Sequence, residues 1–167
     1  MHREGHIGAA LAAWSPFVMA LAAFGAIELA VFSSIGAAAV SMLPDYDQKI
    51  PLVKHRGRTH TVHFALVVGA GFGVLGVLLG LGAGPLLAVG LGIGGALFGT
   101  VTMLSHIAAD ALTPAGVDPY ATGSRISYDV ARAGNPIANW LLLGIGVIAI
   151  VVAVAIGASI GGIIGTV

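Results

Sequence analysis

The chain alternates long apolar stretches with short polar ones, and the apolar stretches predict membrane-spanning helices. Residues 61–105 contain no Asp, Glu, Lys or Arg, and the same holds for residues 133–167. A helix needs about 20 apolar residues to cross the hydrocarbon core of a bilayer. The first stretch is long enough for two spans, and LGAGPLL at residues 81–87 supplies a Gly-Pro turn between them. The second predicts one span, with Asn135 as N-cap and Pro136 at the first helical position.

The N-terminal region, residues 7–43, predicts two further helices joined by a tight turn near Glu28. The second of these is short and rich in Ala, Gly and Ser, so we expect neighbouring helices to shield it. A single re-entrant unit is the alternative for this region. The N-terminus also resembles a secretory signal peptide, but Arg3 is balanced by Glu4 and the apolar run continues past the small-residue site. This pattern favours a retained first helix.

The pattern as a whole predicts an all-α fold, a polytopic membrane helical bundle with about five transmembrane helices in a single domain, residues 1–167. The predicted helices lie at about 7–26, 30–43, 60–82, 85–112 and 137–163, and the polar loops at 44–59 and 113–136. With five spans, the N-terminus and both polar loops fall on one side of the membrane. The turns near residues 28 and 83 and the C-terminus fall on the other side.

Composition and charge support lipid as the solvent and give an orientation. The chain is 57% hydrophobic and 8% charged, whereas soluble domains carry about 25% charged residues. The seven basic residues all fall on the side of the polar loops: Arg3, Lys49, Lys54, Arg56, Arg58, Arg125 and Arg132. The positive-inside rule makes that side cytoplasmic, so we expect a multi-pass inner-membrane protein with its C-terminus outside. Net charge is zero and there is no basic stripe, which predicts no nucleic-acid partner.

His106 and Asp110 are the sharpest candidate for chemistry. They stand at positions i and i+4 of one predicted helix, so both point from the same face. Ionisable residues near membrane depth are costly and usually pair, bind ions or react. One imidazole nitrogen and one carboxylate oxygen form half of a divalent-metal site. The structural alternative is a simple hydrogen bond between the two, but the other ligand-type residues expected at the same membrane level favour a metal.

Two polar motifs in the first loop add candidates. HRGRTH places His55 and His60 on either side of Gly57, which permits a turn that brings both imidazoles to one point. LPDYD offers Asp45, the aspartate nearest the membrane, as a ligand, and Asp47 as a second ligand or as the carboxylate that orients a histidine.

Three neighbouring residues of that loop have open alternatives. Arg56 and Arg58 are either positive-inside anchors or clamps for a substrate phosphate. The helix that follows needs an N-cap, and Thr59 or Thr61 would supply it.

The donor set favours a hard or borderline divalent ion. The chain has no cysteine, and nitrogen and oxygen ligands without sulfur favour zinc, with manganese or iron as alternatives. The candidate metal ligands are His6, Asp45, His55, His60, His106 and Asp110, and the candidate catalytic residues are Asp47, Arg56 and Arg58. These are more donors than one tetrahedral ion needs, so we predict one or two ions. Paired ions are used for phosphate-ester hydrolysis.

The order of these motifs resembles a known family. A histidine at the start of a hydrophobic helix, followed by LPDYD, HRGRTH and HIAADALTPAGV, is similar to the YdjM-like family, over about His6 to Val117. Members are described as LexA-binding, inner-membrane-associated, predicted metal-dependent hydrolases. The resemblance implies a multi-helix membrane protein whose motif residues form a metal site: His6, Asp45, His55, His60, His106 and Asp110. The family usually has Ser where this chain has Thr61, a change that keeps the hydroxyl.

We therefore expect a membrane-bound metal-dependent hydrolase, a phosphoesterase acting on a lipid or lipid-linked phosphate at the cytoplasmic face. A metal-ion or proton transporter is one alternative, although transport sites usually lie near the membrane midplane. A non-catalytic membrane scaffold is another. Glycine spacings such as Gly69/Gly73 and Gly157/Gly161 place small residues on one helix face. Such faces pack helices closely, within one chain or in a homo-oligomer.

Overall fold

The fold, given by a computed structural model that describes residues 1–51 and 54–165, is built from helices. The long helices are α1 (Arg3–Ala23), α2 (Ile27–Val40), α3 (Val62–Gly80), α4 (Pro85–Ala111) and α5 (Pro136–Ile164). Short 3-10 segments are η1 (Pro44–Lys49), η2 (Arg58–His60) and η3 (Leu81–Ala83). In the described part of the chain, five helices are long and apolar enough to cross a membrane, α2 counting together with η1. The predicted all-α membrane bundle is confirmed.

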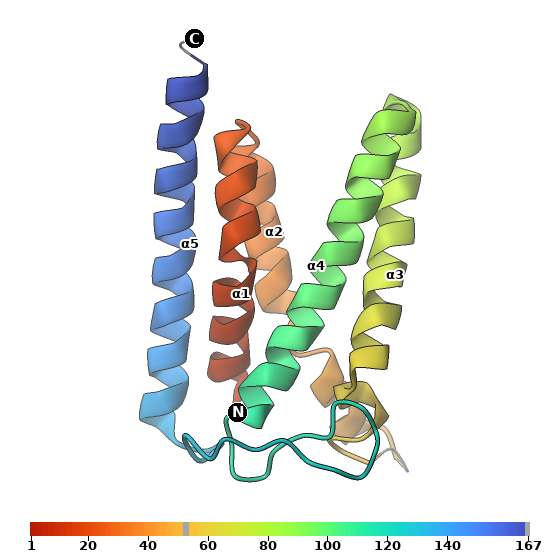
Figure 1. The fold of residues 1–167 in the computed structure, drawn as a ribbon, viewed down its shortest axis with the longest axis vertical. Helices are drawn as coiled ribbons and strands as arrows, with labels where there is room; N and C mark the ends of the chain where they lie inside the picture. The colour runs from red at the N-terminus through yellow and green to blue at the C-terminus, as the bar shows by residue number, and fades with distance from the viewer. Residues whose placement is uncertain (52–53, 166–167) are drawn as a thin grey trace.

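The helices form two close pairs, α1 with the parallel α5 and α3 with the antiparallel α4, and α1 also contacts α4 between the pairs. α1 packs against α5 along its length and also contacts α2 and α4, while α3 packs on α4 as a hairpin. The N-terminus, the α2–α3 connection and the α4–α5 connection lie together at one end of the bundle, which we call the polar end (Figure 1). The α1–α2 and α3–α4 turns and the end of α5 lie at the opposite end (Figure 1). This is the arrangement that five spans predict.

The observed helix ends differ from the predicted ones most at the N-terminus. α1 begins at Arg3 rather than near residue 7, because a helix can continue beyond the apolar zone when its first turn carries a favourable acid such as Glu4. It ends at Ala23 rather than near residue 26, because Gly25 takes a positive φ of 78° and reverses the chain. α5 starts as predicted, with the Asn135 side chain accepting two backbone N–H groups.

Glycines let the helices of each pair approach closely within the chain. On α3, a Cβ added at Gly69 would collide with the Thr100 side chain of α4, and one at Gly76 would collide with the Leu91 carbonyl oxygen. On α5, a Cβ at Gly157 would collide with the backbone of α1. Backbone-to-backbone packing of this kind is typical of small-residue faces in membrane helices. It fixes α4, and with it the polar residues of its last turns, against α3.

Candidate metal centre

A cluster of histidines and aspartates lies inside the polar end, where segments remote in sequence meet. His6 comes from α1, Asp45 and Asp47 from η1, His60 from η2, and His106 and Asp110 from the last turns of α4. His6, Asp47, His60, His106 and Asp110 are each at most 1% exposed. Burial of so many ionisable groups is costly unless they are hydrogen-bonded, paired or bound to a metal.

The ligand-type atoms of Asp45, His60 and His106 form a nearly equilateral triangle. The two Nε2 atoms lie 3.2 Å apart, and Asp45 Oδ1 lies 3.3 Å from His60 Nε2 and 3.5 Å from His106 Nε2. With bonds of about 2.0–2.1 Å, the ligand atoms of a tetrahedral zinc ion lie about 3.3 Å from one another. The triangle therefore has the size of one face of such a tetrahedron.

Asp110 supplies a fourth donor beside this triangle. Its Oδ2 lies 3.5 Å from His60 Nε2 and 3.9 Å from His106 Nε2. Among the residues described, this buried oxygen has no hydrogen-bond partner. A buried carboxylate oxygen without a donor is unusual in a folded protein, and an ion is one of the few groups that satisfies it. The orphaned oxygen and the donor set both fit a divalent metal ion.

In His60 and His106 the Nδ1 atoms form hydrogen bonds, and this leaves the Nε2 atoms free to act as metal ligands. His106 Nδ1 lies 2.7 Å from the carbonyl oxygen of Ser41, so it must donate its proton there. His60 Nδ1 lies 3.0 Å from the Thr59 hydroxyl oxygen, which itself donates to Asp47 Oδ2 at 2.6 Å. In the neutral imidazole only one nitrogen carries a proton, so both Nε2 atoms present lone pairs to the same point. Two lone pairs 3.2 Å apart are stabilised by a cation between them.

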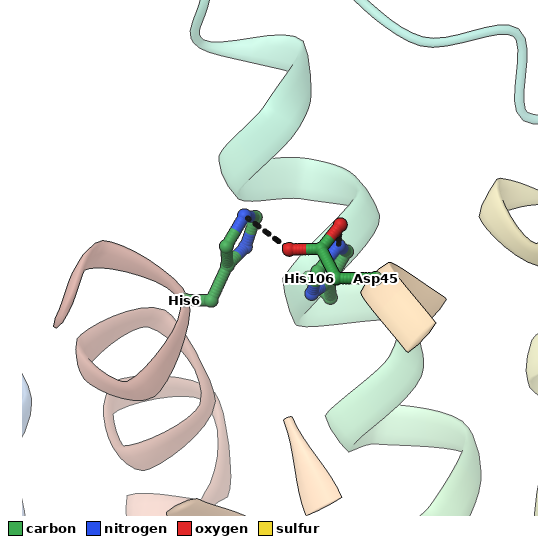
Figure 2. A group of neighbouring side chains, drawn as sticks. All are labelled: His6, Asp45 and His106. Atoms are coloured by element: carbon green, nitrogen blue, oxygen red, sulfur yellow. Dashed lines mark ion pairs between the residues drawn. The ribbon is translucent and has the colours of Figure 1, made fainter. Parts of the chain in front are cut away.

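His6 completes the cluster from the first turns of α1. Its ring stacks on that of His106, with centroids 3.7 Å apart and an interplanar angle of 7°. Its Nε2 lies 3.5 Å from Asp110 Oδ1 and 3.9 Å from Asp45 Oδ2. Figure 2 shows His6, Asp45 and His106 pointing toward one another from three separate segments. His6, in the first turn of α1, thus lies beside the motifs of the distant loop and helix.

Asp47 and His55 lie next to these ligands, with Asp47 buried and His55 exposed at the edge of the cluster. Asp47 Oδ1 lies 2.9 Å from His55 Nδ1, and Asp47 Oδ2 lies 3.4 Å from His60 Nδ1. The His55 side chain is 42% exposed, and its Nδ1 lies 4.0 Å from Asp45 Oδ1. A buried carboxylate that contacts two imidazoles is the usual way in which metal-binding histidines are oriented.

Arg56 forms an ion pair with Asp110. Its guanidinium lies 2.7 Å from Asp110 Oδ1 and also donates to the Thr113 hydroxyl and the Gly116 carbonyl. The same Oδ1 lies 2.6 Å from the amino nitrogen of Met1. The Arg56 backbone takes a φ of 57°, the left-handed region that non-glycine residues rarely adopt. This conformation aims the arginine at the end of α4, and leaves Asp110 Oδ2 to face the histidines.

The structure brings together eight of the nine residues that the sequence singled out. The exception is Arg58, whose side chain is exposed and has no partner among the described residues. Of the two N-cap candidates, Thr61 caps α3 by accepting from Phe64 N at 3.2 Å, and Thr59 instead donates to Asp47. The supporting roles of Thr59 and of the Ser41 carbonyl were missed. For Thr59 the signal was its place inside HRGRTH; nothing in the sequence marked the carbonyl.

The described residues offer three groups of potential ligands, within which the ligand atoms lie within 4.8 Å of one another. They are His6, Asp45 and His106; Asp45, His55 and His60; and His60, His106 and Asp110. Because the groups share members, the cluster is one continuous site. It has enough donors for one ion and for a neighbouring second one.

Comparison with known proteins identifies the family. A family model described as YdjM inner membrane protein matches residues 1–166, nearly the whole chain. The protein therefore belongs to this family, as the order of its motifs predicts. No curated protein and no solved structure matched the chain. The family description and the apolar helices together make this an inner-membrane protein with a buried His/Asp cluster that could hold a metal ion.

Proposed function

We propose that this YdjM-family membrane protein is a metal-dependent hydrolase, a phosphoesterase acting on a lipid or lipid-linked phosphate. The observation that carries the proposal is the triangle of Asp45 Oδ1, His60 Nε2 and His106 Nε2, with sides of 3.2–3.5 Å, beside the unpartnered Asp110 Oδ2. This nitrogen and oxygen donor set suits zinc best, and manganese or iron next. When bound, such an ion supplies Lewis-acid polarisation of a phosphoryl oxygen and activation of water at neutral pH.

The chain's own residues hold and orient the ligands. Asp47 fixes the rings of His55 and His60 through their Nδ1 atoms. Arg56 neutralises one oxygen of Asp110 and so keeps the other directed at the histidines. His55 is the half-exposed histidine of the cluster, and its contact with Asp47 suits it to give or accept a proton at a substrate that approaches from outside.

The position of the cluster supports a substrate that stays in the membrane. His6 and His106 lie near the ends of α1 and α4 at the polar end of the bundle, rather than at mid-length. This placement favours a reaction at the interface over transport through the bilayer. The basic residues gather at the same end, which supports a cytoplasmic site and cytoplasmic N-terminus, with the C-terminus outside.

The test is phosphate release from lipid phosphates by the full chain in detergent or nanodiscs. We expect release from a phosphorylated lipid that requires added Zn²⁺, Mn²⁺ or Fe²⁺ and stops with a chelator. His106→Ala should abolish release, and His63→Ala, an exposed histidine outside the cluster, should leave it unchanged. Absence of release across a panel of lipid monophosphates and diphosphates, from protein that does contain metal, would reject the hydrolase and leave a binding or scaffold role.

A further inference from the structure

A pocket of about 380 Å³ opens beside Asp45, where the start of α1 meets the end of α2 and η1. Asp45 lines this pocket and is also a corner of the ligand triangle. Its side chain is 14% exposed, whereas those of His60 and His106 are 0% exposed. The pocket therefore brings a molecule from outside next to Asp45, one corner of the triangle.

The pocket lining includes two cations that have no role in the cluster. Arg3 comes from the first turn of α1 and Lys49 from the end of η1. Neither forms an ion pair with any acid in the described parts of the chain. The Lys49 ammonium lies 4.5 Å from the centre of the Tyr46 ring, and Tyr46 also lines the pocket. This cation–π contact holds the charge at the pocket wall, where an anionic group would meet it.

Another part of the pocket lining is apolar. It is formed by Ala38, Ala39 and Met42 from the last turns of α2 and the residues just after it. α2 belongs to an apolar segment long enough to cross the membrane, and these residues lie in its last turns and just after them. Tyr46, which also lines the pocket, is 53% exposed, and exposed tyrosines are typical of membrane interfaces.

We propose that this pocket binds a phosphate-bearing lipid, with Arg3 and Lys49 pairing with its phosphate oxygens and its apolar chain lying along Ala38, Ala39 and Met42. Two cations in the lining suit an anionic headgroup, and the apolar residues of the lining favour a lipid over a free phosphate. Asp45 then lies between the bound headgroup and the buried histidines. The inference deepens the proposed function by naming the residues that select its substrate, and lipid binding itself requires no reaction.

The test is binding of a fluorescent phosphatidic acid to the full chain in nanodiscs of neutral phosphatidylcholine. A charge-assisted hydrogen bond contributes about 1.5–3 kcal/mol, so we expect Arg3→Gln and Lys49→Gln each to weaken binding at least about 10-fold. The matched control is Arg132→Gln, which removes an exposed cation of the polar end that does not line the pocket. Affinity that is unchanged in the Arg3→Gln, Lys49→Gln double variant, or lowered equally by Arg132→Gln, overturns the proposal.

A second arm separates a lipid from a free phosphate. Met42→Gln adds a polar group to the apolar part of the lining, so it should weaken phosphatidic acid binding and leave inorganic phosphate binding unchanged. Inorganic phosphate that competes as strongly as the lipid, with no effect of Met42→Gln, rejects the lipid assignment. Phosphate release measured on the same samples tells the two proposals apart. Lipid binding that depends on Arg3 and Lys49 without any hydrolysis rejects the hydrolase alone, whereas hydrolysis unaffected by the double variant rejects the pocket alone.

Discussion

Asp47→Asn tests how the metal centre is held, because Asp47 contacts the candidate ligands without belonging to the triangle. Its Oδ2 accepts the Thr59 hydroxyl at 2.6 Å and lies 3.4 Å from His60 Nδ1, and its Oδ1 lies 2.9 Å from His55 Nδ1. Asparagine has nearly the same shape but replaces one of these oxygens with an NH₂ group, which donates and cannot accept. One histidine then loses its acceptor, and with it the tautomer that leaves Nε2 free to bind metal.

The expected loss of metal affinity follows from the role of the Asp47 carboxylate in orienting the histidines. Loss of a carboxylate that orients a ligating histidine lowers metal affinity by roughly 10- to 100-fold. That range corresponds to about 1.4–2.7 kcal/mol of binding free energy at 25 °C. The fold should be retained, because asparagine fills the same buried volume. We therefore expect metal affinity to fall while the melting temperature of the metal-free protein stays close to that of the wild type.

The assay is competition for Zn²⁺ between the detergent-purified protein and a chromophoric chelator, which gives the dissociation constant of each variant. Asp129→Asn is the matched control, since Asp129 is an exposed aspartate of the same polar end. It makes the same chemical change away from the cluster and should leave the affinity unchanged. Wild-type affinity in Asp47→Asn, or an equal loss in Asp129→Asn, would refute the orienting role.

Three further predictions concern packing, charge pairing and pH. Gly76→Ala should lower the free energy of unfolding, measured by chemical denaturation, by about 1–3 kcal/mol, because the added Cβ collides with the backbone of α4. Gly71→Ala, whose Cβ would lie in open space, should not lower it. Arg56→Ala should cost about 3 kcal/mol in the same assay, because Asp110 loses a buried partner; a loss below about 1 kcal/mol would contradict the pairing. Slight desolvation raises the pKa of Asp118, but backbone N–H groups of its loop outweigh it and lower the pKa overall. The loop amides should therefore stay protected from hydrogen exchange above pH about 4 and lose protection as pH falls through the lowered folded pKa, and protection that does not fall in acid would contradict this.

Much of the fold was predictable because the bilayer imposes few solutions. Uncharged runs such as 61–105 have to cross as helices, and the Gly-Pro turn and the Asn135 cap then mark where helices stop and start. The ends of α1 were not predictable from the apolar pattern, because the first turn of a helix can contain polar residues such as Arg3 and Glu4 outside the apolar zone. The apolar content of a segment indicates where the chain meets lipid. The ends of its helix depend also on backbone geometry, such as the positive φ of Gly25.

The members of the site were predictable from topology, and their partners were not. Two spans, α3 and α4, separate the loop histidines from the end of α4, so both lie on one side of the membrane and His60 and His106 come to the same level. Which atom faces which depends on contacts between remote segments. The sequence could not show that Arg56 turns toward Asp110 rather than toward a substrate, because that requires its left-handed backbone and the position of α4.

Elemental analysis of the detergent-purified protein is the most direct measurement, since Asp45, His60, His106 and Asp110 should together hold a divalent metal ion. We expect the wild type to contain one or two transition-metal ions per chain, with zinc predominant, and the exposed-histidine control His63→Ala to match it. His106→Ala should lose most of this metal. A wild-type protein without stoichiometric metal, or a His106→Ala variant that retains the full amount, would contradict the existence of the metal centre.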